Sequence, residues 1–163
     1  MKSLALLTDY WNWNLQMIDP ECTAVVTVTQ VKVEEKNRKA VFLNQEHIAH
    51  TKIRMDGCVV RNATAADWVV TKEGVGTVIV ELKGKDVEHG ARQVTATAQY
   101  LKDQNYAMPK VAALIVASSY PKASPTIQKS QSKFFRQFKG PLHVVTRNET
   151  FTFERVLSAA GPK

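Results

Sequence analysis

The chain has 163 residues, of which 44% are apolar and 23% charged, an ordinary composition for a soluble globular protein. This length is enough for one domain with a substantial core, and no apolar stretch approaches the roughly 20 residues that span a bilayer. The 22 lysines and arginines exceed the 15 acidic residues, giving a net charge of +7 and a pI near 9.5. This excess favours a polyanionic partner, nucleic acid first and an acidic membrane surface second, although a merely basic protein would show it too.

The apolar run near the N-terminus is too short for a signal peptide. Two cysteines, Cys22 and Cys58, are too few for a disulfide scaffold and lack the further ligands of a zinc site. We interpret them as thiols in a reducing compartment. We therefore expect a cytoplasmic protein.

The N-terminal third is predicted to contain a helix and a pair of strands. Apolar residues recur through residues 3–18, and the Asp-Pro pair that follows would end a helix or helix-plus-turn. β-branched residues alternate over residues 23–33, which predicts one strand. A polar turn over residues 34–39 and a short strand over residues 40–43 would complete a hairpin.

The central third is predicted to form three strands. Residues 52–61 form the first, with Gly57 as a bulge or, together with Asp56, as a turn. Residues 67–71 and 77–83 form the other two, joined by a glycine-containing turn.

The rest of the chain is predicted to alternate helices and strands. Asp86 can cap a helix over residues 87–104, whose apolar side chains recur at helical spacing. The almost wholly apolar segment 111–118 is typical of a central strand covered on both faces. Because the helix crosses between two strands, those strands should be parallel neighbours. The remaining elements are a second helix over residues 125–138 and strands over residues 142–146 and 150–154. We expect a single α/β or α+β domain with a mixed sheet flanked by helices.

A carboxylate and an ammonium group stand two residues apart at the end of the strand over residues 77–83. Alternate side chains of a strand share a face, so Glu81 and Lys83 would lie side by side with Leu82 turned into the core. Asp67 opens the preceding strand. Two carboxylates with a lysine can hold Mg²⁺, activate a water and stabilise negative charge on a phosphate. The backbone carbonyl of Leu82 is a further candidate ligand.

The same spacing of an acid and a lysine occurs earlier, in Glu34-Glu35-Lys36. We interpret that copy as part of a solvated turn. The later copy differs because an apolar strand leads into it and a crossover helix follows. The alternative for the later copy is a strand end with an exposed Glu and Lys.

The combined pattern resembles the PD-(D/E)XK nuclease superfamily over residues 50–118. The resemblance rests on Asp67 at one strand, Glu81 and Lys83 on the next, and Gln93 on the following helix. It implies a restriction-endonuclease-like core and a DNA nuclease that depends on Mg²⁺ or Mn²⁺. It also implies that Asp67 and Glu81 bind the metal, Lys83 serves the nucleophilic water and Gln93 supports the site.

Two features of the family pattern are incomplete. Ala66 stands where the family name implies a proline, which many members lack. Many members add an acidic residue from an N-terminal helix, and here Asp56 or Glu46 could complete the metal site. A turn position for Asp56 and a surface position for Glu46 are the alternatives.

Positive side chains near the motif and on the second helix are candidate nucleic-acid contacts. Lys85 and Arg92 follow the motif, whereas Lys129, Lys133 and Arg136 share one face of the second helix, with its phenylalanines turned inward. A solvated charged face is the alternative. The histidines are weaker candidates for metal ligands because they lack zinc-type spacing: His47, His50, His89 and His143. Trp11 and Trp13 are expected in the core or in a dimer interface.

The sequence thus predicts a Mg²⁺-dependent endonuclease that acts on DNA. The chain leaves little room for a separate sequence-reading domain, so we expect recognition of DNA structure rather than of a long sequence. A duplex or branched substrate calls for two sites, which favours a homodimer. The alternatives are a non-catalytic nucleic-acid-binding or assembly protein on the same fold, and an RNA nuclease.

Overall fold

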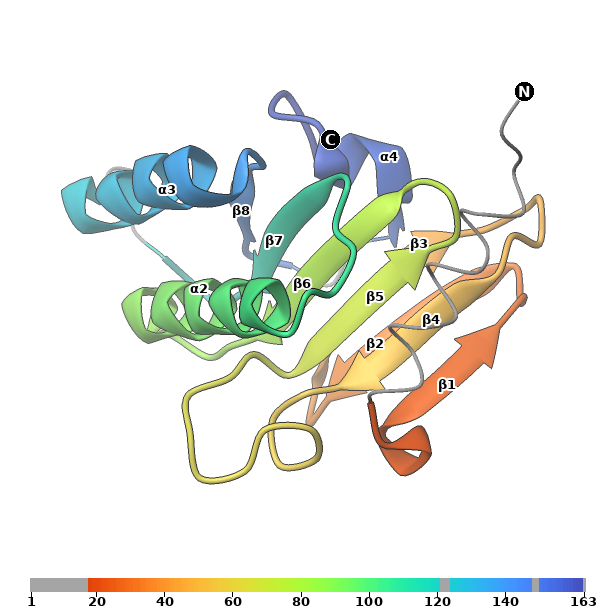
Figure 1. Cartoon of the computed structure of the whole chain (residues 1–163). Helices are drawn as coiled ribbons and strands as arrows, with labels where there is room; N and C mark the ends of the chain where they lie inside the picture. Colours follow the sequence, from red (N-terminus) through yellow and green to blue (C-terminus); the bar gives the residue numbers. More distant parts are fainter. Residues whose placement is uncertain (1–17, 121–123, 148–149, 163) are drawn as a thin grey trace, which may run out of the picture.

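The computed structural model describes residues 18–120, 124–147 and 150–162 (Figure 1). Its larger sheet has the strand order β1-β4-β5-β6-β7-β8, and its smaller sheet the order β2-β3-β9. The mixed α/β architecture predicted from the sequence is confirmed. The helix predicted over residues 3–18 lies, apart from residue 18, outside the described residues. Within the described ranges, no helix has both the length and the apolar character needed to cross a bilayer.

The larger sheet combines an antiparallel half and a parallel half. Its antiparallel strands are β1 (Thr23–Val26), β4 (His50–Arg54), β5 (Trp68–Lys72) and β6 (Gly76–Leu82). Its parallel strands, beyond β6, are β7 (Val111–Val116) and β8 (Leu142–Val145). Helix α2 (Val87–Asp103) crosses from β6 to β7, so the predicted parallel pairing of these neighbours is confirmed.

The prediction of one strand over residues 23–33 is wrong, because this segment forms two strands in different sheets. β1 ends at Val26, and β2 (Gln30–Glu35) pairs with β3 (Arg38–Leu43) instead. β3 also pairs with the parallel strand β9 (Thr150–Thr152). β-branched residues continue through the segment between β1 and β2, so the sequence pattern does not mark the break. The break is evident only because the two strands have different pairing partners. The hairpin itself is confirmed, but its turn is only two residues long.

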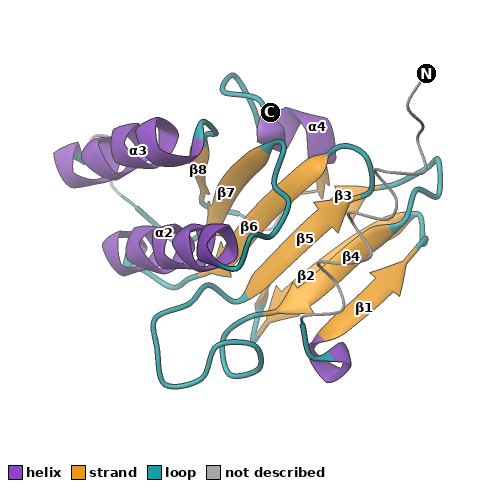
Figure 2. Ribbon diagram, viewed as in Figure 1, coloured by secondary structure: helices purple, strands orange, loops and turns teal. Residues whose placement is uncertain are grey.

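The two faces of the larger sheet are covered differently. Helices α2 and α3 (Pro125–Phe138) lie on one face, as Figure 2 shows, and their apolar side chains pack on β4 to β7. The smaller sheet and α4 (Phe153–Leu157) pack on the other face. Every residue of β6 and β7 is consequently buried, as predicted for the apolar segment that became β7.

The predicted helices begin at capped residues. The Asp86 side chain accepts a hydrogen bond from His89 N, and Ser124 Oγ accepts one from Ile127 N. In α3, Phe134 is buried but Phe135 is 50% exposed, so the expectation that all its phenylalanines turn inward is wrong. The two side chains point about 100° apart on the helix, and only one of these directions faces the sheet.

Two predicted strands are shorter than expected. The strand predicted over residues 52–61 ends at Arg54, and Gly57, with φ of 73°, forms a turn in which its N–H donates to the Val60 carbonyl. The strand predicted over residues 150–154 ends at Thr152, where α4 begins. This short helix was not predicted from the sequence.

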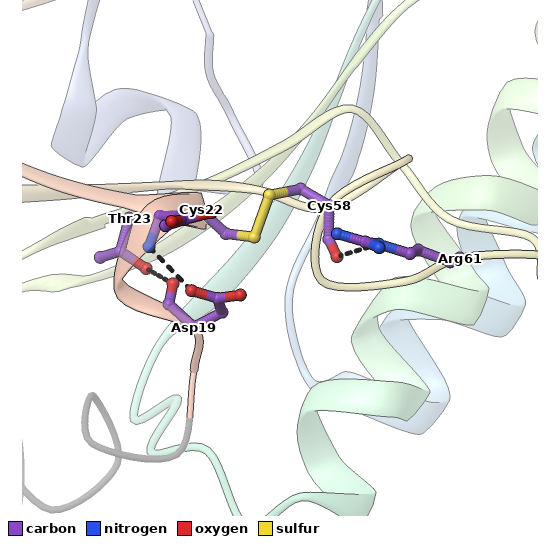
Figure 3. The surroundings of a disulfide bond; sticks show 6 residues. Asp19, Cys22, Thr23, Cys58 and Arg61 are labelled. Atoms are coloured by element: carbon purple, nitrogen blue, oxygen red, sulfur yellow. Dashed lines mark hydrogen bonds between the residues drawn. A yellow bond between two sulfur atoms is a disulfide. The ribbon is translucent and has the colours of Figure 1, made fainter.

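Cys22 and Cys58 form a disulfide bond, with their Cα atoms 5.7 Å apart (Figure 3). The interpretation of these residues as free thiols is therefore wrong. The two residues are 36 positions apart, and the pairing of β1 with β4 brings them together. The bond joins the residue before β1 to the loop over residues 55–60, which carries Asp56.

Candidate active site

Asp67 and Glu81 lie opposite each other on adjacent strands. Asp67 directly precedes β5. Because Trp68 pairs with Val80, the next pair of opposing residues is Asp67 and Glu81. Asp67 N donates to Glu81 Oε2 over 3.1 Å, and Leu82 N donates to Asp67 Oδ2 over 2.9 Å. Backbone groups of the opposite strand thus hold each carboxylate.

This reciprocal bonding uses one oxygen of each carboxylate. Glu81 Oε1 lies 3.7 Å from Lys83 Nζ, and no described residue donates a hydrogen bond to Asp67 Oδ1. The two remaining oxygens accept no hydrogen bond from the described residues, which makes them the candidate ligands for a cation.

Lys83 and Gln93 complete the arrangement on the α2 side. Lys83 Nζ donates to Gln93 Oε1 over 2.8 Å, and Gln93 Nε2 donates to the Ala65 carbonyl over 3.0 Å. Gln93 is buried, so its amide is held at both ends. The amide connects Lys83 to the segment that leads into Asp67. The structure thus brings together all four residues that the sequence motif selected.

The site has two carboxyl groups and one ammonium group. Glu81 is only 2% exposed, and burial together with the neighbouring Asp67 raises its pKa to about 8, against the opposing effect of Lys83. Burial also raises the pKa of Asp67, with smaller contributions from the charges of Glu35 and Asp56. A bound divalent cation would neutralise this excess, because it favours the ionised form of both carboxylates.

The donor set fits a hard cation such as Mg²⁺. Magnesium usually takes one or two carboxylates, with waters and substrate phosphate as its other ligands. Among the described residues, no group of three or more His, Cys, Asp or Glu side chains could hold a metal ion. Of the described acidic side chains, Asp67 and Glu81 would therefore hold the metal, with the Leu82 carbonyl, water and substrate as further ligands.

Neither candidate for a third carboxylate ligand joins this pair. Asp56 is exposed in the loop over residues 55–60, although its charge still contributes to the raised pKa values of Asp67 and Glu81. Glu46 is exposed and follows the end of β3, whereas the start of that strand, Arg38, lies beside Gly84 next to the site. Asp56 acts at a distance, and Glu46 lies away from the site.

Two charged residues near the site, Glu35 and Arg38, were not predicted from the sequence. Glu35 was assigned to a solvated turn, but it is the last residue of β2, half-buried and paired in register with Arg38. Glu35 follows Val31 and Val33 at two-residue spacing, so all three side chains lie on one face of the strand. This spacing in the sequence could have indicated that Glu35 faces inward.

The predicted nucleic-acid contacts lie on separate surfaces. Lys85 is exposed just beyond Lys83. Arg92 and Lys133 line a solvent-open groove of about 340 Å³ between α2 and α3. The other two, Lys129 and Arg136, are exposed elsewhere on α3, where Arg136 borders a second groove beside β8.

None of the four histidines forms a metal-binding group with the carboxylate pair among the described residues. His143 Nε2 is within 3.0 Å of the Val156 and Ser158 carbonyls, and His50 is fully buried against Phe153. Of the other two histidines, His47 is exposed and His89 is half-buried near Arg92. The interpretations of Trp11 and Trp13 concern residues outside the described ranges.

Comparisons of the chain with protein-family models, curated proteins and solved structures found no match.

Proposed function

We propose that the protein is a Mg²⁺- or Mn²⁺-dependent endonuclease that hydrolyses phosphodiester bonds in DNA. One observation carries this proposal. Asp67 and Glu81 are hydrogen-bonded to each other's strands so that each has an oxygen left for a cation, and Lys83 is fixed beside them. A buried carboxylate, Glu81, held against a half-buried one, Asp67, is costly without a cation, so their fixed arrangement supports a metal-binding role.

The residues have distinct roles in this proposal. Asp67 and Glu81 would hold the metal, which supplies Lewis acidity and lowers the pKa of a bound water. The Lys83 ammonium can orient the attacking water and stabilise the negative charge that develops on the phosphate. Gln93 holds Lys83 in position through its Oε1. Hydrolysis then adds the water oxygen to phosphorus and breaks the bond to one ester oxygen.

The chain order of these elements supports the resemblance to PD-(D/E)XK nucleases. Asp67 precedes β5, the antiparallel neighbour of the strand that carries Glu81, and α2 then crosses to the parallel strand β7. This is the order that the resemblance implies for the metal ligands, the lysine and the supporting glutamine.

We also propose an assembly state and a location for the protein. A homodimer would present two sites to duplex or branched DNA, and the mass in solution tests this. We also propose a cytoplasmic location. Thiols stay reduced there, so we expect cleavage by protein in which the disulfide between Cys22 and Cys58 has been reduced.

Cleavage of a substrate panel tests the proposal. Linear, nicked, branched and single-stranded DNA, with matched RNA, would be incubated with the protein in Mg²⁺, Mn²⁺ or EDTA. We expect metal-dependent cleavage of DNA, with a preference for one structure over the others. Cleavage of RNA alone would identify an RNA nuclease instead. DNA binding that is indifferent to EDTA, without cleavage in either metal, would identify a non-catalytic binding protein.

A further inference from the structure

The inward face of the β2–β3 hairpin changes from apolar to charged along its length. Val31 opposes Phe42 and Val33 opposes Ala40, and all four are buried against the larger sheet. The next inward pair is Glu35 opposite Arg38, and both side chains are half-buried. Charged residues at the end of a core-facing row call for a reason other than packing.

This charged end of the hairpin lies beside the candidate active site. A Cβ built on Gly84, the residue after Lys83, would lie 3.7 Å from Arg38 Nη2. On the same hairpin, the charge of Glu35 acts on Asp67. The carboxyl end of β6 is therefore bordered by α2 on one side and by the hairpin end on the other.

Arg38 has no acidic partner within the described residues. The salt bridges found there join Lys32 to Glu34, Lys72 to Glu154 and Lys83 to Glu81. Arg38 is half-buried as a residue, so its side chain loses part of its hydration, and an anion that accepts hydrogen bonds from the guanidinium would compensate for that loss. The planar guanidinium can bind two phosphate oxygens at once, which a lysine cannot do.

We propose that the charged end of the β2–β3 hairpin is the second wall of the site and that Arg38 there binds a phosphate of the nucleic-acid backbone. This inference rests on the proposed nuclease function, because it takes the substrate phosphate to enter at the edge of β6. Arg38 would contact a phosphate beside the scissile one and so set the position of the strand over Asp67 and Glu81. Glu35 would add negative charge near the metal without contacting the substrate.

Three variants test the role of Arg38: Arg38→Gln, Arg38→Lys and the control Arg155→Gln, which removes the same charge from an exposed position on α4. DNA binding would be measured in EDTA, where a metal-dependent reaction cannot proceed, from 50 to 200 mM salt. Arg38→Gln should weaken binding roughly tenfold, as expected for one charge-assisted hydrogen bond. It should also reduce the salt slope by about 0.9, the value for one lost phosphate contact. Arg38→Lys should keep the slope and recover part of the affinity.

The outcomes separate this inference from the proposed function. If the wild type cleaves DNA and Arg38→Gln has the affinity and salt slope of Arg155→Gln, Arg38 binds no phosphate although the nuclease assignment stands. If the wild type binds DNA without cleaving it, and the slope changes only in Arg38→Gln, the phosphate site is supported and the nuclease assignment is wrong. A wild type that neither binds nor cleaves nucleic acid would overturn both. Thermal unfolding of each variant shows whether a loss of binding reflects unfolding.

Discussion

The β5–β6 hairpin carries buried charge at both ends, and the two ends differ in how that charge is balanced. At the turn of this hairpin, the Lys72 side chain is only 11% exposed, and its Nζ lies 2.5 Å from Glu154 Oε1 of α4. At its open end, Asp67 and Glu81 share a single lysine, 3.7 Å from Glu81 Oε1. One end is a pair of opposite charges, and the other has an excess carboxylate.

The pKa directions of the two ends show what this difference means. Although partial burial opposes it, the hydrogen bond and charge of Lys72 hold the pKa of Glu154 below its usual value. At the open end, burial and Asp67 raise the pKa of Glu81 to about 8. The charges at the turn stabilise each other in the folded chain alone. At the open end, two carboxylates lie beside one ammonium group among the described residues, an imbalance more typical of a binding site than of a structural ion pair.

The largest expected difference between the two ends is in catalysis. Asp67→Asn or Glu81→Gln should lower the rate of DNA cleavage by roughly 10³-fold, because each removes a negative charge that would hold the metal in the proposed site. The matched variant Glu154→Gln should cleave at nearly the wild-type rate. Single-turnover cleavage in saturating Mg²⁺ measures all three. Equal losses of cleavage rate in Glu81→Gln and Glu154→Gln would show that the open end of the hairpin has no catalytic role distinct from that of its turn.

The second difference is in the pH dependence of stability without metal. Glu81 has a usual pKa of 4.5 and a folded pKa of about 8, so between these values the folded chain holds a proton that the unfolded chain releases. Stability should therefore fall as pH rises through this window, by a few kcal/mol in total. Glu81→Gln should flatten this dependence. Denaturant unfolding in EDTA at pH 5 and pH 8.5 measures it, and an equally steep fall in the variant would contradict the assigned cause.

The smallest expected effect is the stability cost of breaking the balanced pair. Glu154→Gln leaves the nearly buried Lys72 without its carboxylate and should lower the free energy of unfolding by about 1–3 kcal/mol. Glu81→Gln at pH 8 should instead leave stability unchanged or raise it, because it removes an uncompensated buried charge. Urea midpoints at constant m-value compare the two variants. Destabilisation by Glu81→Gln as large as that by Glu154→Gln would mean that Glu81 is a structural partner of Lys83.

The residues of the candidate site were predictable because they are close together in the chain. Asp67, Glu81, Lys83 and Gln93 lie on consecutive elements, where a short turn sets the strand register and helical spacing turns Gln93 inward. The apolar strand that became β7 was equally clear, because all its residues are buried. Local patterns were sufficient for this part of the molecule.

The parts that were not predicted depend on contacts between distant segments. Glu35 and Arg38 reach the site because their hairpin packs across the larger sheet, and no local pattern states where a hairpin will dock. The bond between Cys22 and Cys58 likewise requires the pairing of β1 with β4, which depends on a change of partner after Val26. Sequence periodicity indicates which face of a helix or strand is buried. It does not indicate which other segment of the chain packs against that face.

Binding of Mn²⁺ tests the central claim most directly, because it needs neither a chosen substrate nor a catalytic assay. Electron paramagnetic resonance would count the Mn²⁺ ions bound by the wild type and by the variants Glu81→Gln and Glu154→Gln at pH 8. We expect at least one bound ion per chain in the wild type, the same number in Glu154→Gln, and one fewer in Glu81→Gln. Equal binding by all three proteins, or none in the wild type, would contradict the assignment of Asp67 and Glu81 as metal ligands.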